Sequence, residues 1–228
     1  MSLAPAPIRR EIVLVRNSTV WRRLAVHPAL AGVSFTAIGH HDLAGFDFSP
    51  ADRVWVFSYS RVPAENCAML ARLGTAGVAE IAYLSSSSAI VTRRTRCWEY
   101  PRVKQQAEDE ALALPNGKVL TVGLMHADAA ELPAGDNIAT SYDMLAAFMR
   151  SPEWTDGDGR RRHLFRVEPR PYRIGLERTL ARLYGVALEA CGTHPCLLRP
   201  FDLLLRLLGM RWYGYTFLSN RLWISTTS

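Results

Sequence analysis

A serine run, a tyrosine and a lysine stand at a spacing that suits proton transfer. Ser87 lies in a run of four serines, Tyr100 follows thirteen residues later, and Lys104 comes one helical turn after Tyr100. A tyrosine hydroxyl has a pKa of about 10, and a neighbouring ammonium lowers it by favouring the phenolate. A serine hydroxyl can hydrogen-bond a carbonyl or alkoxide oxygen. The pattern predicts an acid–base centre in which Tyr100 exchanges the proton and Ser87 binds the reacting oxygen.

The basic residues of the chain are unevenly divided. There are 25 arginines and two lysines, one of which is Lys104. Lysine offers a compact ammonium, whereas arginine is a rigid, always charged fork. A chain that uses arginine almost throughout is expected to keep lysine where a guanidinium does not serve. The alternative is a serine cap at a strand end and a solvated tyrosine–lysine pair without chemistry.

Apolar runs alternate with helical patterns over the first 125 residues. Buried strands are expected at 11–15, 33–38, 53–58, 81–84 and 118–124, and helices at 17–26, 63–74 and 99–113. Strands that are apolar throughout and alternate with helices indicate a parallel sheet covered on both faces. The predicted fold class is α/β, a trimmed, doubly wound, Rossmann-like sheet with ligands at the carboxyl ends of its strands.

The pattern changes after about residue 125, where helices are expected at 142–149 and 174–190. We therefore predict a flexible N-terminal tail over 1–10, a Rossmann-like α/β core over 11–130 and a small, mostly helical substrate lobe over 131–228, packed on the core. The apolar run Phe201–Trp212 is expected to be a helix buried in that lobe. Because arginines flank this run, binding to a membrane surface is the alternative.

Composition excludes several classes of protein. The chain contains no run of 18 apolar residues, so no membrane span is predicted. The first ten residues do not resemble a secretory signal. A cytoplasmic location is therefore expected. The net charge of +6 suits anionic small molecules such as nucleotides or phosphosugars. The basic patch Arg160–His163 is interpreted as a solvated turn, and no nucleic-acid module is predicted. Cys191–Cys196 holds three candidate ligands but lacks a fourth, so no metal site is predicted.

Two segments resemble the short-chain dehydrogenase/reductase superfamily. Gly77–Ser88 resembles the fourth-helix-to-fifth-strand segment of its sugar-nucleotide epimerase/dehydratase branch, and Tyr100–Lys104 resembles that branch's Y-P-x-x-K motif. Val119–Leu124 falls where the family has its sixth strand, so the resemblance covers about 60 residues. It implies NAD or NADP as cofactor, a sugar or sugar nucleotide as substrate, a role in polysaccharide assembly and a homodimer.

The same resemblance assigns roles to individual residues. Tyr100 would be the acid/base, Lys104 would lower its pKa and hold the nicotinamide ribose, and Ser87 would bind the reacting oxygen, with Ser86 as the alternate register. Asn66 falls near a helix-start asparagine of that branch. Further contacts are expected from two groups of polar residues: Ser88 and His126 for the substrate, and Asn17, Ser18, Asp42 and Ser58 for the cofactor.

The chain departs from the family in its dinucleotide-binding turn. The family has G-x-x-G-x-x-G after the first strand, whereas Arg16–Arg22 contains no glycine, and none occurs between residues 11 and 31. Without glycine the backbone cannot approach a pyrophosphate closely. The region between the first strand and the helix at Asn66 is also about 25 residues shorter than in the epimerase branch, so one strand–helix unit is expected to be missing.

Three functional hypotheses remain open at this point. The first is an epimerase-, dehydratase- or oxidoreductase-type enzyme that moves a proton, with or without a hydride, on a sugar nucleotide. The second is a non-catalytic binding or regulatory module that kept the fold but lost the cofactor. The third is a cofactor-independent isomerase or lyase that uses the tyrosine–lysine pair for proton chemistry alone. A dinucleotide in the purified protein would separate the first from the others, and Tyr100→Phe would separate the second from the third.

Overall fold

A computed structural model of the chain describes residues 10–154, 159–172, 175–191, 197, 199–200, 203–204, 207 and 213–227. The expected tail, most of the turn at 156–159 and the segment 192–196 lie outside these residues, and so does most of Phe201–Trp212. The described leucines of that last segment, Leu203, Leu204 and Leu207, are exposed. None of the helices in the described part of the chain combines the length and apolarity that crossing a bilayer requires.

The main sheet has six strands in the order β2-β1-β3-β4-β5-β8. Their bounds are β1 Arg10–Val15, β2 Phe35–Gly39, β3 Asp52–Val56, β4 Glu80–Ser86, β5 Gly117–Val122 and β8 Arg161–Leu164. β1 pairs in parallel with both β2 and β3, and β3 pairs in parallel with β4. Four helices flank this sheet: α1 Thr19–Leu24, α2 Pro63–Thr75, α3 Glu99–Ala113 and α4 Tyr142–Arg150. The Rossmann-like α/β class predicted from the sequence is confirmed.

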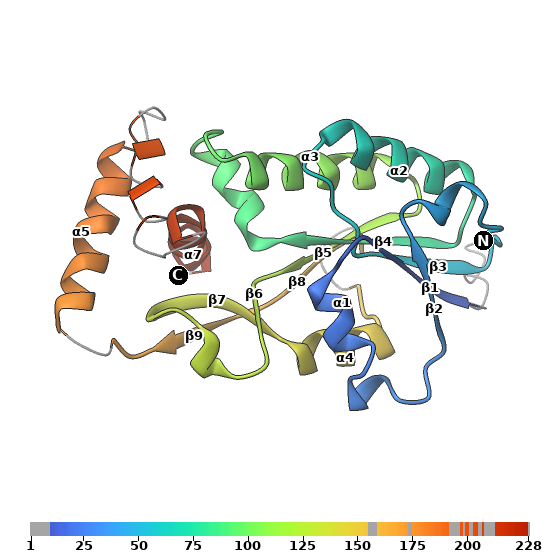
Figure 1. Cartoon of the computed structure of the whole chain (residues 1–228), viewed down its shortest axis with the longest axis horizontal. Helices are drawn as coiled ribbons and strands as arrows, with labels where there is room; N and C mark the ends of the chain where they lie inside the picture. Colours follow the sequence, from blue (N-terminus) through green and yellow to red (C-terminus); the bar gives the residue numbers. More distant parts are fainter. Residues whose placement is uncertain are drawn as a thin grey trace. The chain divides into compact units, whose positions relative to one another are not determined.

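The strands are buried on both faces because helices cover both faces. Ile12, Val13 and Leu14 of β1 have no exposed surface. Figure 1 shows α2 and α3 on one side of the sheet and α1 and α4 on the other. β2 is the edge strand in the described residues, whereas the full doubly wound order places a further strand outside it. The chain passes instead from β2 to β3 through a short 3₁₀ helix, η2 (Asp42–Ala44).

Glycine divides the strand that the sequence predicts at 118–124. β5 ends at Val122, and β6 (Leu124–His126) belongs to a second sheet. A Cβ atom on Gly123 would lie 2.4 Å from the carbonyl oxygen of Ile138, so only glycine fits this approach of two backbones. The amide of Gly123 donates to the hydroxyl of Thr140 at 2.8 Å. The predicted strand is therefore two strands that diverge at Gly123.

The chain forms two compact units, each made of several stretches of sequence. Unit 1 comprises Met1–Ser85, Gln106–Thr121 and Tyr142–Leu164, and unit 2 comprises Ser86–Gln105, Val122–Ser141 and Phe165–Ser228. Unit 1 contains the six-stranded sheet. Unit 2 contains a sheet in the order β6-β7-β9, with β7 at Gly135–Ser141 and β9 at Arg166–Arg170. It also contains the 3₁₀ helix η3 (Ser87–Arg93) and the helices α5 (Gly175–Cys191) and α7 (Tyr213–Thr227).

Replacing Leu73 by alanine is expected to lower the free energy of unfolding by about 2–5 kcal/mol. Leu73 lies on the buried face of α2, has no exposed surface and packs in the main core of unit 1. Urea unfolding followed by circular dichroism measures the change. The matched control is Val26→Ala, because Val26 is 82% exposed and its truncation should cost at most about 0.5 kcal/mol. Equal midpoints for the two variants would contradict this account of the core.

Candidate functional site

The serine run lies where β4 gives way to η3. β4 ends at Ser86, and η3 begins at Ser87. The Ser86 hydroxyl oxygen accepts a hydrogen bond from the Ser88 amide at 3.3 Å and lies 2.9 Å from the Ser88 hydroxyl oxygen. Ser87 and Ser88 are buried, with 6% and 4% of their surface exposed. The end of β4 therefore presents two hydroxyl groups that are hydrogen-bonded to each other.

Tyr100 reaches this serine pair from the first turn of α3. Its hydroxyl shares a hydrogen bond with the side chain of Ser86. Burial raises the pKa of Tyr100, and the hydrogen bond with Ser86 offsets part of that rise. The sequence predicts the opposite direction, a pKa lowered by Lys104. In this structure Tyr100 is a neutral phenol at neutral pH, which makes it a proton donor.

Lys104 lies one helical turn after Tyr100 on α3, so both side chains share one side of the helix. Only 7% of Lys104 is exposed. A lysine is seldom buried to this extent, because removing an ammonium from water is costly unless other groups compensate for it. The helix expected around these two residues is present, and their joint role in proton transfer stays a prediction.

The serine that contacts Tyr100 is Ser86, the alternate register of the sequence analysis. The described contacts of Ser87 are made by its carbonyl oxygen, which accepts from the Ser219 hydroxyl and from the Trp223 indole nitrogen, both at 2.9 Å. These donors come from α7, which also stacks the ring of Tyr215 on the ring of Tyr100, with centroids 5.6 Å apart and 26° between the planes. Tyr215, Ser219 and Trp223 thus hold α7 against the serine–tyrosine pair.

The turn after β1 forms without glycine. Asn17 takes the left-handed backbone conformation that glycine usually supplies, with φ of 52°, and asparagine tolerates it better than most residues. The Ser18 hydroxyl caps α1 by accepting from the Trp21 amide at 3.2 Å. Arg16 is paired with Glu65 of α2 at 2.6 Å. The two residues predicted to contact the cofactor therefore serve the turn itself.

These residues do not fit the way in which the family's glycine-rich turn binds a dinucleotide. The family's glycines allow the helix to pack tightly on the sheet and the backbone to approach the pyrophosphate. Here the Trp21 ring stands between α1 and the strands, 5.4 Å from the Phe35 ring and 5.7 Å from the Phe57 ring by centroids. The Ser18 cap also takes one of the amide groups that a phosphate would use.

Asp42 and Ser58, which are also predicted to contact a cofactor, and Asn66 have local partners in unit 1. The Asp42 carboxylate accepts from the Gly39 amide at 3.2 Å. The Ser58 hydroxyl lies 3.3 Å from the Nδ1 atom of His40, and burial lowers the pKa of His40, with the charge of Arg16 adding to the effect. Asn66 is buried and bonds both the amide and the carbonyl of Ser60, so it secures the loop before α2.

His126 lies in the second sheet of unit 2. It ends β6, is 3% exposed, and its Nε2 atom lies 3.3 Å from a carboxylate oxygen of Glu168 on β9. The other carboxylate oxygen of Glu168 accepts from Arg166 at 2.6 Å. This contact joins β6 and β9 across β7, which lies between them in the sheet, and the predicted substrate contact of His126 stays a prediction.

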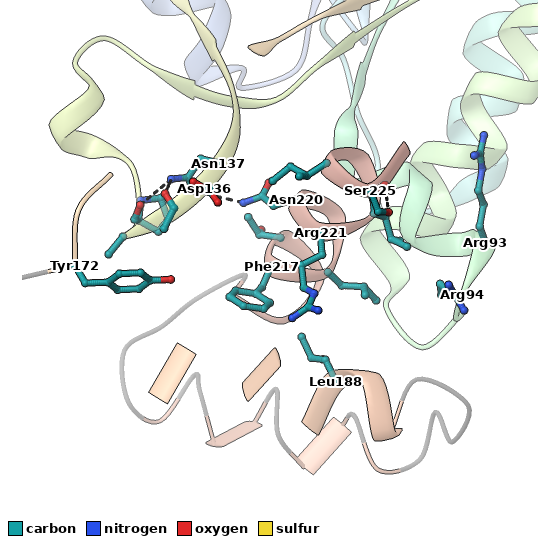
Figure 2. A pocket seen from close by; sticks show the side chains of 17 residues that line it. Arg93, Arg94, Asp136, Asn137, Tyr172, Leu188, Phe217, Asn220, Arg221 and Ser225 are labelled. Carbon is teal, nitrogen blue, oxygen red and sulfur yellow. Dashed lines mark hydrogen bonds between the residues drawn. The ribbon is translucent and has the colours of Figure 1, made fainter. Parts of the chain in front are cut away.

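Unit 2 also contains a cavity of about 980 Å³. Three arginines line it, Arg93 and Arg94 at the end of η3 and Arg221 on α7, together with apolar and polar side chains. Figure 2 shows Phe217 and Arg221 projecting from α7, with Arg93 and Arg94 to one side and Tyr172 to the other. The serine run, Tyr100 and Lys104 do not line this cavity.

Sequence reasoning missed the residues of α7 that touch the serine–tyrosine pair. The aromatic end of the chain is visible as a composition, but nothing in its spacing ties Tyr215 to Tyr100 or Trp223 to Ser87. The cavity arginines were missed for the same reason, because Arg94 and Arg221 are far apart in sequence. Among the described residues, no group of three His, Cys, Asp or Glu side chains could hold a metal ion.

Comparison with known proteins identifies the fold. No family model and no curated protein matches the sequence. Among solved structures, a short-chain dehydrogenase/reductase superfamily protein from Agrobacterium tumefaciens with bound NAD is similar at a TM-score of 0.53 and 12% identity, over 78% of this chain and 83% of the other. A UDP-galactose 4-epimerase is similar at a TM-score of 0.51 and 12% identity, over 79% of this chain and 83% of the other. The chain shares its Rossmann-like α/β fold with these two proteins.

Proposed function

We propose that the chain binds a sugar or sugar nucleotide and transfers a proton on it through Tyr100, without a dinucleotide. The observation that carries this proposal is the hydrogen bond between Tyr100 and Ser86, next to the Ser86–Ser88 pair. Lys104 lies one turn along α3 from Tyr100, and in this proposal its ammonium is the positive charge that acts on the phenol. Part of the Tyr100 side chain is exposed, although its hydroxyl group is buried.

Proton transfer in this proposal starts from the neutral phenol of Tyr100, whose pKa is raised by burial. A neutral phenol donates its proton to a carbonyl oxygen of the substrate, and the O–H bond of Tyr100 breaks as the new O–H bond forms. The ammonium of Lys104 stabilises the phenolate that remains. The phenolate then takes the proton from the carbon next to that carbonyl, so the C–H bond breaks, the O–H bond of Tyr100 forms again and the substrate becomes an enol. The hydroxyls of Ser86 and Ser88, 2.9 Å apart, exchange the phenol proton with solvent, and the reverse steps restore the carbonyl. This sequence of steps moves protons only.

The substrate class follows from the proposal that only protons, and no hydride, are transferred. Epimerisation or dehydration of a saturated sugar carbon begins with oxidation, and oxidation needs a hydride acceptor. NAD or NADP would supply that acceptor in this fold, but the turn at Asn17 and Ser18 does not fit it. If the protein holds no hydride acceptor, its substrate must already carry a carbonyl group, as a 4-keto sugar nucleotide or a ketose phosphate does. The likeness to a UDP-galactose 4-epimerase supports the sugar-nucleotide class.

Calorimetric titration with NAD and with NADP is expected to give no binding heat. The physical reason is the glycine-free turn, with Trp21 between α1 and the sheet and Arg16 already paired with Glu65. Circular dichroism of the same sample confirms that the protein is folded. Saturable heat with either dinucleotide would contradict the cofactor-free mechanism and would return hydride transfer to this site.

A second function is favoured by one observation. The cavity of unit 2 is lined by arginines and not by Tyr100, so binding alone could be the task of this fold. A non-catalytic module would hold its ligand without exchanging carbon-bound protons. In that case Tyr100→Phe would leave every measurable property of the complex unchanged, which separates the two functions.

A further inference from the structure

The cavity beside α7 carries an excess of positive charge. Arg93, Arg94 and Arg221 line it, and Asp136 is the single carboxylate among its lining residues, which leaves two net positive charges. Within the part of the chain that the structure describes, Arg93 and Arg94 have no carboxylate partner. Arginines collected around a concave surface are the usual way in which proteins hold phosphate groups, because the guanidinium fork matches two phosphate oxygens.

The cavity and the serine–tyrosine pair are contacted by different residues of α7. Residues of an α-helix are spaced by about 100° around its axis. Tyr215, Ser219 and Trp223 fall within about 80° of one another and face Tyr100 and Ser87. Phe217 and Arg221 lie roughly opposite them and line the cavity.

We infer that this cavity is a second site, which binds an organic phosphate apart from the Tyr100 centre. The inference goes beyond the proposed function, because it concerns a ligand that does not touch the reacting phenol. The volume of about 980 Å³ is far larger than one phosphate ion needs and falls within the range of sites for small organic molecules.

The cavity also provides contacts for the organic part of such a ligand. Phe217 of α7 and Leu188 of α5 offer apolar surface beside Arg221, as Figure 2 shows, and Tyr172 offers a second ring. Gly185 leaves room for the guanidinium of Arg221 against α5, since a Cβ there would lie 2.5 Å from its Nη1 atom. A flat ring with a phosphate attached therefore matches both the charge and the apolar surface.

Phenyl phosphate is the probe, with phenol as the uncharged control and isothermal calorimetry at low and physiological salt as the measurement. We expect saturable binding of phenyl phosphate that weakens as salt rises, and none of phenol. Arg94→Ala and Arg221→Ala should each weaken binding by roughly tenfold or more, since a charged hydrogen bond contributes about 1.5–3 kcal/mol. Asp136→Asn should tighten binding several-fold, because it removes the one carboxylate. Arg22→Ala, an exposed arginine of unit 1, should change nothing.

Two results would overturn the inference. One is the absence of binding to the folded chain, or equal affinity of the wild type and both arginine variants. The other is loss of phenyl phosphate binding in Tyr100→Phe, which would place the anion at the serine–tyrosine pair. If the proposed function fails instead, phenyl phosphate binding persists while no proton exchange is seen, so the two failures are distinguishable.

Discussion

Replacing Tyr100 by phenylalanine is expected to lower the rate of proton exchange on a bound keto sugar by roughly 10²- to 10⁴-fold, the usual contribution of a positioned acid or base. The substitution removes one oxygen and keeps the ring that stacks on Tyr215. Exchange is measured in D₂O by proton NMR, as the loss of carbon-bound signals next to the carbonyl. The substrates are a 4-keto sugar nucleotide and a ketose phosphate, each also incubated without protein.

Tyr59→Phe is the matched control for this experiment, because Tyr59 is a partly buried tyrosine of unit 1. Its exchange rate should equal that of the wild type. The raised pKa of Tyr100 also fixes the pH dependence. The reactive form is the protonated phenol, so the rate should hold through neutral pH and fall only above a pH of about 10. A rate that rises or falls with a midpoint near neutral pH would assign the proton to another group.

Replacing Lys104 by methionine is expected to lower the same exchange rate by roughly 10- to 100-fold, because the proposal assigns to its ammonium a stabilisation of the phenolate of about 1.5–3 kcal/mol, the size of an interaction with a charged group. Methionine has a similar length and is apolar, so it suits a position that is 7% exposed. The rate is compared with that of the wild type at saturating substrate.

The chain offers its other lysine as the control. Lys118 pairs with Glu80 at 2.7 Å in unit 1 and lies 5.0 Å from the centre of the Trp154 ring. Lys118→Met removes the same ammonium from a structural position, so exchange should be unchanged although stability falls. If both methionine variants exchange protons at the wild-type rate, Lys104 has no part in the chemistry.

The strands and helices of the first 125 residues could be predicted because their signals are local. Continuous apolar runs mark the strands of a sheet covered on both faces, and Pro63 marks the start of α2 where the structure has it. The break at Gly123 could not be predicted, because it depends on the backbone of Ile138 from another strand. β8 and β9 were also missed, since their arginine-rich sequences lack the apolar pattern of buried strands.

In the candidate site, too, features set by local sequence could be predicted, and features set by distant residues could not. The tyrosine–lysine spacing is local, and both residues lie on α3, one turn apart. The choice between Ser86 and Ser87 is not local, because it depends on how η3 turns the run after β4. The pKa direction of Tyr100 was predicted wrongly, since burial is invisible in sequence spacing. Arg160 illustrates the point again: the sequence indicates a solvated turn, but its guanidinium donates to the carbonyls of Leu112 and Gly117 near the end of α3.

The central claim is tested most directly by proton exchange in D₂O. The wild-type chain is first freed of any nucleotide and then given a 4-keto sugar nucleotide. The account predicts that deuterium enters the carbon next to the carbonyl at a rate proportional to protein concentration, with no NAD or NADP added. Exchange that begins only after a dinucleotide is supplied, or that proceeds equally with Tyr100→Phe, would contradict it.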